Sequence, residues 1–218
     1  MRTITLIEAQ KNNPNRVNIY LDDQYAFGLN RIVAAWMKVG QQLSDEKIAA
    51  LQEADAREVA MQKALHFLGY RPRSVEEVRK NLQKHEISPA VIEATLARLE
   101  REKLIGDGNF AREWVENRNA FHPKGKRALA IELRQKGLSD TVIQETLDEN
   151  LDEQALALKA AQNYARKLEA LEWPAFRQKL GGYLGRRGFG YNVIAPVTRQ
   201  VWEEMHDPVD YFDSEDLT

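Results

Sequence analysis

The 218-residue chain contains no cysteine, which excludes disulfide bonds, thiolate-held zinc and a thiol nucleophile. It also contains no run of about 18 apolar residues, so we expect no helix that spans a membrane. Residues 1–13 show no apolar stretch followed by a small-residue cleavage site, so no signal peptide is predicted. These absences favour a protein of the reducing cytoplasm.

Sequence motifs of catalysis are absent as well. The sequence has four histidines, which are His66, His85, His122 and His206. They are scattered without metal-ligand spacing, and no phosphate-loop motif occurs. The glycine-rich stretch 181–190 fits a helix better than a phosphate cradle, because Leu180 and Leu184 keep helical spacing and no strand precedes it. We therefore predict that the chain is not an enzyme and holds no metal or other cofactor.

Charge is distributed unevenly, although the formal net charge is only −2. Residues 203–218 carry seven acidic groups and no lysine or arginine, and without them 31 basic residues stand against 26 acidic ones. Residues 166–199 contain seven lysines and arginines against two glutamates. A basic face beside an acidic tail indicates a polyanionic partner, and an ordinary solvated helical surface is the alternative.

The N-terminal residues predict a small β-region. Residues 3–7 and 17–21 have strand patterns, and Asp22-Asp23 predicts a turn before a return strand at 25–29. A hairpin alone is only marginally stable in water, so we expect it to pack on a helix at 32–37. A further helix is predicted from Ser44, a capping residue, to about residue 51.

An internal repeat is the main feature of the remaining sequence. A shift of 51 residues aligns three segments without gaps, and five apolar positions recur in all three. The five sets are Val78, Leu129 and Leu180; Leu82, Leu133 and Leu184; Ile87, Leu138 and Phe189; Val91, Val142 and Val193; and Ile92, Ile143 and Ile194. Five matches at one spacing indicate the core face of a three-helix unit that occurs three times.

Capping signals mark the helices within each unit. The first unit is predicted to have a helix at about 56–68 and a capping box at Ser74. The third unit is predicted to begin with a helix at about 152–170. Gly137 and Gly188 follow the second helix of their units, where a left-handed residue is favourable only for glycine. Because the first unit has Glu86 at this position, its turn must differ or be strained.

The predicted fold class is mainly α, with three tandem, helix-turn-helix-like three-helix repeats and a small N-terminal β-hairpin region. One unit of about 50 residues buries little surface, so we expect the repeats to stack in an elongated array. The expected boundaries are 1–54 for the β-hairpin and its helices, 55–105, 106–151 and 152–205 for the three repeats, and 206–218 for an acidic, disordered tail.

Ordered motifs between residues 16 and 202 resemble those of a known family. They are Ala64-Leu65, Arg71-Pro72-Arg73-Ser74, Asp107, Phe110-Ala111, Trp114-Val115-Glu116-Asn117-Arg118, Gly125, Ile131-Glu132-Leu133-Arg134-Gln135-Lys136-Gly137 and Tyr183-Leu184-x-Arg186-Arg187-Gly188-Phe189. In this order and with these spacings the chain resembles the RecX regulators of the RecA recombinase, whereas one motif alone would be weak. His85-Glu86, where the family commonly has Lys-Gly, and the acidic tail depart from its pattern.

The resemblance implies a regulator of DNA repair and recombination that binds in the helical groove of the RecA–single-stranded DNA filament. There it would block or trim filament growth and so lower strand exchange, ATP hydrolysis and the co-protease activity of the SOS response. Single-stranded DNA, and double-stranded DNA in addition, are implied as direct partners, and we expect a monomer. The candidate contact residues are Arg118, Lys124, Lys126, Arg127, Lys136, Arg186 and Arg187.

Each of these cations has an ordinary alternative, as a solvated or helix-terminal charge. We interpret Leu82, Leu133, Leu184, Gly137, Gly188 and Phe189 as structural. Two other functions stay open. An independent DNA-binding helix-turn-helix repeat protein is favoured by the basic third unit, although the acidic helix predicted after Ser139 suits a major groove poorly. A scaffold for an unrelated protein is the other.

Overall fold

A computed structural model describes residues 1–206, apart from the side chain of Asn150. The chain divides into two compact units, Met1–Gly106 and Asp107–Thr218. Except for its first residue, the acidic tail predicted at 206–218 lies outside the described residues.

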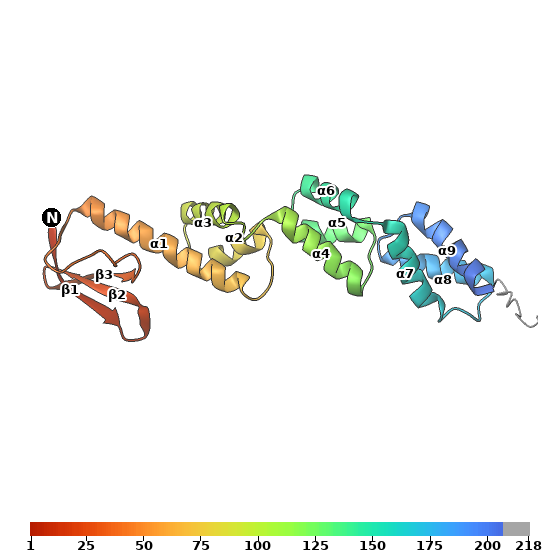
Figure 1. Cartoon of the computed structure of the whole chain (residues 1–218), viewed down its shortest axis with the longest axis horizontal. Helices are drawn as coiled ribbons and strands as arrows, with labels where there is room; N and C mark the ends of the chain where they lie inside the picture. Colours follow the sequence, from red (N-terminus) through yellow and green to blue (C-terminus); the bar gives the residue numbers. More distant parts are fainter. Residues whose placement is uncertain (207–218) are drawn as a thin grey trace, which may run out of the picture. The chain divides into compact units, whose positions relative to one another are not determined.

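Within the described residues, four strands form an antiparallel sheet at the start of the first unit (Figure 1). They are β1 (Arg2–Gln10), β2 (Asn13–Leu21), β3 (Gln24–Asn30) and β4 (Gln42–Leu43), in the order β3-β2-β1-β4. The predicted β-region is therefore confirmed, with one short strand added. Asp22 and Asp23 have φ angles of 50° and 66°, the backbone that a tight two-residue hairpin turn needs.

The helix predicted at 32–37 is wrong, because residues 31–36 form successive turns. The buried Asn30 begins them, and its side-chain oxygen accepts the N–H of Ile32 at 3.1 Å. Trp36, the last residue of these turns, is 89% exposed. The connection has to cross from one edge strand to the other, about 14 Å at the usual strand spacing. Because β4 pairs with β1, this crossing rather than the local apolar pattern decides the course of residues 31–41.

One helix, α1 (Asp45–Leu68), joins the sheet to the first repeat (Figure 1). Ser44 caps it as predicted, through a side-chain hydrogen bond to the first turn. The break predicted between residues 51 and 56 is wrong. No glycine or proline occurs inside α1, so nothing in its sequence interrupts the helix. The boundary expected between residues 54 and 55 lies inside it.

Three three-helix repeats are confirmed. Repeat 1 consists of the end of α1, α2 (Val75–Lys84) and α3 (Pro89–Arg101). Repeat 2 consists of α4 (Asp107–Phe121), α5 (Lys126–Gln135) and α6 (Asp140–Asn150). Repeat 3 consists of α7 (Glu153–Ala165), α8 (Trp173–Arg186) and α9 (Tyr191–His206).

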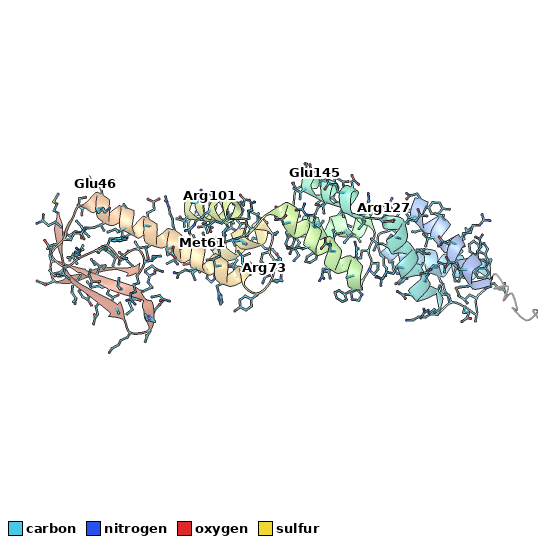
Figure 2. All side chains as sticks on the ribbon, in the orientation of Figure 1. Glu46, Met61, Arg73, Arg101, Arg127 and Glu145 are labelled. Atoms are coloured by element: carbon cyan, nitrogen blue, oxygen red, sulfur yellow. The ribbon has the colours of Figure 1, made fainter. Side chains whose placement is uncertain are left out.

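Each repeat has its own apolar core, and the 51-residue spacing identifies it. All fifteen aligned residues lie in these cores, twelve of them buried, with Ile87, Val142 and Ile194 half-buried. Met61 on α1 completes the core of repeat 1 (Figure 2). The first helix of repeat 3 ends at Ala165, earlier than predicted, and turns then lead the buried Leu168 back into the core.

The turn after the second helix has the same left-handed backbone in every repeat. Gly137 and Gly188 have φ angles of 85° and 86°, and Glu86 has 59°. The expected strain at Glu86 is therefore present, since a left-handed backbone costs a non-glycine residue about 1–2 kcal/mol. Ser74 forms the predicted capping box with Glu77 at the start of α2.

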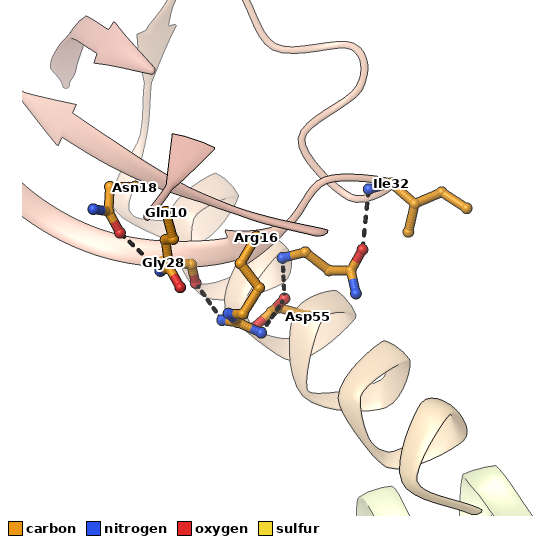
Figure 3. A network of polar contacts seen from close by, with 7 residues as sticks. Gln10, Arg16, Asn18, Gly28, Ile32 and Asp55 are labelled. Atoms are coloured by element: carbon orange, nitrogen blue, oxygen red, sulfur yellow. Dashed lines mark hydrogen bonds and ion pairs between the residues drawn. The ribbon is translucent and has the colours of Figure 1, made fainter. Parts of the chain in front are cut away.

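A polar network fixes the sheet against the middle of α1. The guanidinium of Arg16 on β2 donates to both carboxylate oxygens of Asp55, at 2.9 and 3.4 Å, and to the carbonyl of Gly28 at 3.1 Å (Figure 3). The backbone N–H of Asn30 donates to the same carboxylate. A Cβ at Gly28 would lie 2.9 Å from the side-chain amide of Gln10, so the absence of a side chain there leaves room for the network.

Candidate partner-binding surface

The residue that ends the second helix is basic in every repeat. It is His85 after α2, Lys136 after α5 and Arg187 after α8. These positions are equivalent under the 51-residue shift. A cation at a helix C-terminus interacts favourably with the helix dipole, which explains the residue type without any partner. We call the place where this residue meets the first and second helices the basic corner of the repeat.

The basic corner of repeat 2 is a charged cluster around Glu132 on α5. Its carboxylate accepts hydrogen bonds from Arg118 Nε at 2.9 Å, from Trp114 Nε1 at 2.8 Å and from Lys124 Nζ. Arg118 and Lys136 lie over the Trp114 ring, at 4.5 and 4.9 Å from its centroid. Two cations, Arg118 and Lys124, therefore share one carboxylate, and Lys136 lies over the neighbouring ring.

Glu132 stays ionised within this cluster. Burial by itself would raise its pKa, but the hydrogen bonds from Lys124, Trp114 and Arg118 and the attraction of Lys124 outweigh burial. They hold the pKa of Glu132 below its ordinary value. The charged carboxylate fixes the positions of Arg118 and Lys124, so both predicted contact residues also have a structural role.

In repeat 3 two tyrosine rings lie at the basic corner, beside Arg187. Tyr164 on α7 and Tyr183 on α8 stack with their ring centroids 4.0 Å apart and an interplanar angle of 3°. The guanidinium of Arg187 lies over the Tyr183 ring at 4.7 Å, and its Nη1 donates to the carbonyl of Pro123 at 3.0 Å. Arg187 therefore links repeat 3 to the segment that precedes α5 in repeat 2.

Repeats 2 and 3 meet at this segment, which we call the glycine junction. The N–H of Gly125 donates to the carbonyl of Arg187 at 2.9 Å, and that of Arg127 to the carbonyl of Gly188 at 3.3 Å. A Cβ at Gly125 would lie 2.4 Å from the Gly188 carbonyl oxygen. A Cβ at Gly188 would lie 2.4 Å from the backbone nitrogen of Ala128. Only glycine fits at either position, so the two backbone segments are held in direct contact.

The predicted contact residues gather in two places. Arg118 and Lys136 belong to the cluster around Glu132, together with Lys124. The residues at the glycine junction are Lys124, Lys126, Arg127, Arg186 and Arg187.

Pairing distinguishes the cations of the junction from one another. Lys126 is paired with Asp148 at 2.7 Å. Arg127, labelled in Figure 2, and Arg186 are exposed, and neither has a side-chain partner in the part of the chain that the structure describes. These two cations are therefore the best placed to meet another molecule.

Sequence reasoning did not identify three members of this surface. Glu132 is the centre of its cluster, Gly125 is a contact point, and Tyr164 is a stacking partner, but none was a candidate residue. Their partners are distant in sequence: Glu132 and Arg118 are 14 residues apart, and Arg187 and Pro123 are 64 apart. The available signal was the equivalence of His85, Lys136 and Arg187 under the 51-residue shift.

Neither a metal centre nor a membrane span is found in the described residues. No group of three or more histidine, aspartate or glutamate side chains there could hold a metal ion. No helix in residues 1–206 is long and apolar enough to cross a membrane.

Family models match the chain in four consecutive parts. The N-terminal domain of regulatory protein RecX matches residues 2–44. The first, second and third three-helix domains of RecX match residues 60–99, 107–147 and 152–197. The order of these matches is the order of the sheet and the three repeats.

Relatives that match most of the chain agree with this assignment. Regulatory protein RecX of Bacillus subtilis is 36% identical over 205 residues, covering 92% of this chain and 78% of the relative. That of Bacillus pumilus is 34% identical over 211 residues, covering 95% and 80%. A crystal structure of regulatory protein RecX matches with a TM-score of 0.73 at 28% identity, over 91% of this chain and 100% of the other. RecX from Lactobacillus salivarius, at 23% identity and a TM-score of 0.64 over 68% and 97% of the two chains, supports the fold alone. The chain belongs to the RecX family of regulatory proteins.

Proposed function

We propose that this chain regulates a RecA recombinase by binding in the groove of the filament that RecA forms on single-stranded DNA. The expected effect is mainly inhibition of ATP hydrolysis, strand exchange and co-protease activity. The observation that carries the proposal is the match to all four RecX domains in their order along the chain. The mechanism is binding, and no chemical step is assigned to any residue.

The glycine junction supports a specific set of contacts. Arg127 and Arg186 are exposed cations on two segments that the backbone contact holds together. Because the contact fixes the backbone at both positions before a partner arrives, only side-chain freedom is lost on binding. Phosphates of DNA or carboxylates of the recombinase are the groups that would neutralise them. The cluster around Glu132, where Arg118 and Lys124 share one carboxylate, would supply further contacts through Arg118 and Lys136.

Independent DNA binding by the helix-turn-helix-like repeats is the second candidate function. In repeat 2 the third helix, α6, would be the reading helix, and its acidic side chains disfavour entry into a major groove. Two of them are already paired, Asp140 with Arg134 and Asp148 with Lys126.

The test is ATP hydrolysis by the cognate RecA on single-stranded DNA, with and without substoichiometric amounts of this protein. We expect strong suppression at low ratios, because a protein that stops filament growth acts on many protomers at once. Unchanged hydrolysis at equimolar protein would contradict the proposal and leave independent DNA binding as the function.

Charge reversal tests the contact surface. The double variant Arg127→Glu and Arg186→Glu should need at least about tenfold more protein for the same suppression, equivalent to a loss of about 1.4 kcal/mol. Lys159→Glu is the control, since Lys159 is an exposed cation on α7. Circular dichroism should show unchanged helicity in both proteins. Equal losses in the two would mean that only net charge matters, and the junction would no longer be the contact site.

A further inference from the structure

A groove of about 430 Å³ lies within the first unit, between the β1–β2 hairpin, α1 and α2. One face of α1 forms its floor, where Lys63, His66 and Phe67 follow one another at helical spacing. Asn81 and His85 on α2 form one wall, and the hairpin forms the other. This face of α1 is therefore left uncovered by the other helices of repeat 1.

The charge of the groove is positive. No aspartate or glutamate is among the residues that line it. Lys63 Nζ donates to His85 Nδ1 at 3.4 Å and has no carboxylate partner in the described chain. Arg16 also lines the groove, but its charge is already neutralised by Asp55 (Figure 3). Arg16 therefore shapes the groove without adding an unpaired charge to it. Lys63 is thus the cation that remains for an anionic ligand.

Aromatic rings line the same groove as this cation. Tyr70 is one turn beyond His66, its ring meets the imidazole edge-to-face at 5.2 Å, and its hydroxyl lies 3.2 Å from His66 Nε2. This contact orients the Tyr70 ring, although the residue is 71% exposed. Phe67 lies next to it, and the guanidinium of Arg73 lies over the Phe67 ring at 4.0 Å. The groove therefore offers an oriented, exposed ring and a cation in one lining.

Only repeat 1 leaves its basic corner open in this way. The residue equivalent to Lys63 in repeat 2 is Trp114, whose ring is covered by Arg118 and Lys136. In repeat 3 the corner is closed by the stack of Tyr164 on Tyr183. A ligand that needs both a cation and an exposed ring is therefore accommodated by the groove of repeat 1.

We propose that this groove binds a nucleotide of single-stranded DNA, with its phosphate at Lys63 and His85 and its base against the ring of Tyr70. A cation that meets the backbone and a ring that stacks on a base are the two elements with which proteins hold single strands. A duplex hides the faces of its bases and would leave Tyr70 unused. An acidic peptide would use Lys63 but would leave the ring unused as well.

This inference deepens the proposed function, since it names a contact to the DNA strand of the filament. Its test needs no recombinase. A chain that suppresses RecA but fails the test below keeps the proposed function and loses only this site.

The test measures binding of the full chain to a fluorescent oligothymidylate by anisotropy over a series of salt concentrations. Tyr70→Ala should weaken binding about tenfold with an unchanged salt dependence, because stacking is uncharged. Lys63→Ala should weaken binding several-fold and lower the slope of log K against log salt by about 0.7, the value for one phosphate contact on a single strand. Tyr70→Ala should leave binding of a duplex unchanged.

Matched controls make the same chemical changes elsewhere in the first unit. Lys47→Ala removes an exposed lysine from the first turn of α1, and Tyr25→Ala removes an exposed tyrosine from β3. Both should bind as the unchanged chain does. Equal losses in variants and controls, or unchanged binding by both groove variants, would overturn the proposal.

Competition experiments distinguish a DNA strand from a free nucleotide and from an acidic protein segment as the ligand of the groove. Oligothymidylate should displace the fluorescent strand from the unchanged chain far better than thymidine monophosphate does. If the monophosphate competed equally well, the groove would be a site for free nucleotides and the strand assignment would be wrong. Displacement by polyglutamate that depends on Lys63 but not on Tyr70 would point to an acidic protein segment and would also overturn the proposal.

Discussion

The two units of this protein join their parts in different ways. In the first unit, α1 runs without interruption from the sheet to repeat 1, and Asp55 in its middle fastens the sheet. In the second unit, separate helices are held at the glycine junction, where Gly125 and Gly188 bring two backbones together. In the first unit, the many backbone hydrogen bonds of a continuous helix together hold the sheet and repeat 1 in place. In the second unit, one close backbone contact holds repeats 2 and 3 together. The stability of the second unit should therefore be much more sensitive to one methyl group added at this contact.

The basic corners differ in a second way. In repeats 2 and 3 aromatic side chains fill the corner, and cations lie over Trp114 in repeat 2 and over Tyr183 in repeat 3. In repeat 1 Lys63 stands at the position equivalent to Trp114, and a groove remains. The same three-helix backbone thus has a closed corner in repeats 2 and 3 and an open one in repeat 1. Repetition of a fold therefore does not imply repetition of a binding site.

The largest expected effect is that of Gly125→Ala. The new methyl group would overlap the carbonyl of Gly188, and backbone can move away only by opening the junction. We expect a loss of about 3 kcal/mol in the free energy of unfolding of the second unit, at the upper end for an overpacked site. Urea unfolding followed by tryptophan fluorescence would measure it, since Trp114, Trp173 and Trp202 all lie in this unit.

Gly106→Ala is the control for this substitution. A Cβ at Gly106 would have nothing within 4 Å, so the same chemical change meets no neighbour there. We expect a change within about 0.5 kcal/mol, as for an ordinary surface substitution. Equal effects at Gly125 and Gly106 would mean that the close contact does not hold repeats 2 and 3 together.

An intermediate effect is expected at Glu132. Glu132→Gln removes the charge that Arg118 and Lys124 share, and we expect a loss of about 1.5–2 kcal/mol at pH 7, at the lower end for hydrogen bonds to charged groups. The pKa of Glu132 is lowered in the folded chain, so its stabilisation is complete above the unfolded value of about 4.3. That stabilisation is lost as the pH falls from the unfolded pKa through the folded one, because the unfolded chain binds the proton more readily than the folded chain in this window.

The stability difference between Glu132 and Glu132→Gln should therefore be constant near neutral pH and shrink below about pH 4. Urea unfolding at a series of pH values checks this. Glu145→Gln is the matched control, since Glu145 is an exposed residue on α6 for which the structure shows no ion pair (Figure 2). A pH dependence that Glu145→Gln shares would contradict a specific role for the cluster.

Local signals in the sequence predicted most of the repeat architecture. The 51-residue spacing identified the cores, because each apolar position is buried by its own repeat. The capping box at Ser74 and the left-handed Gly137 were predictable, because they depend on a few neighbouring residues. The helix at 32–37 was not, because the pairing of β4 with β1 decides the course of that connection.

The binding surfaces depend on contacts that the sequence does not reveal. Lys63 and His85 meet across 22 residues, and Gly125 meets Gly188 across the second and third repeats. The basic character of the seven candidate residues could be read from the sequence, but their pairing could not. The structure assigns Glu132 and Asp148 as partners to some of them. Whether each contacts a filament remains a prediction.

The smallest expected effect concerns the turn in which repeat 1 departs from the other two. Glu86 adopts a φ angle of 59°, which costs a non-glycine residue about 1–2 kcal/mol. Glycine relieves this strain but loses about 0.5–1 kcal/mol through the greater freedom of the unfolded chain. Glu86→Gly should therefore stabilise the first unit by about 0.5–1 kcal/mol in urea unfolding followed by circular dichroism.

Glu86→Ala is the control, because it removes the carboxylate but keeps the Cβ that causes the strain. It should give no gain, and Gly137→Ala should destabilise repeat 2 by about 1 kcal/mol through the opposite change. If Glu86→Ala were as stabilising as Glu86→Gly, the side chain rather than the backbone would be the source of the cost. The difference between repeat 1 and the other repeats would then lie in their surface charges, since all three turns would be equally favourable.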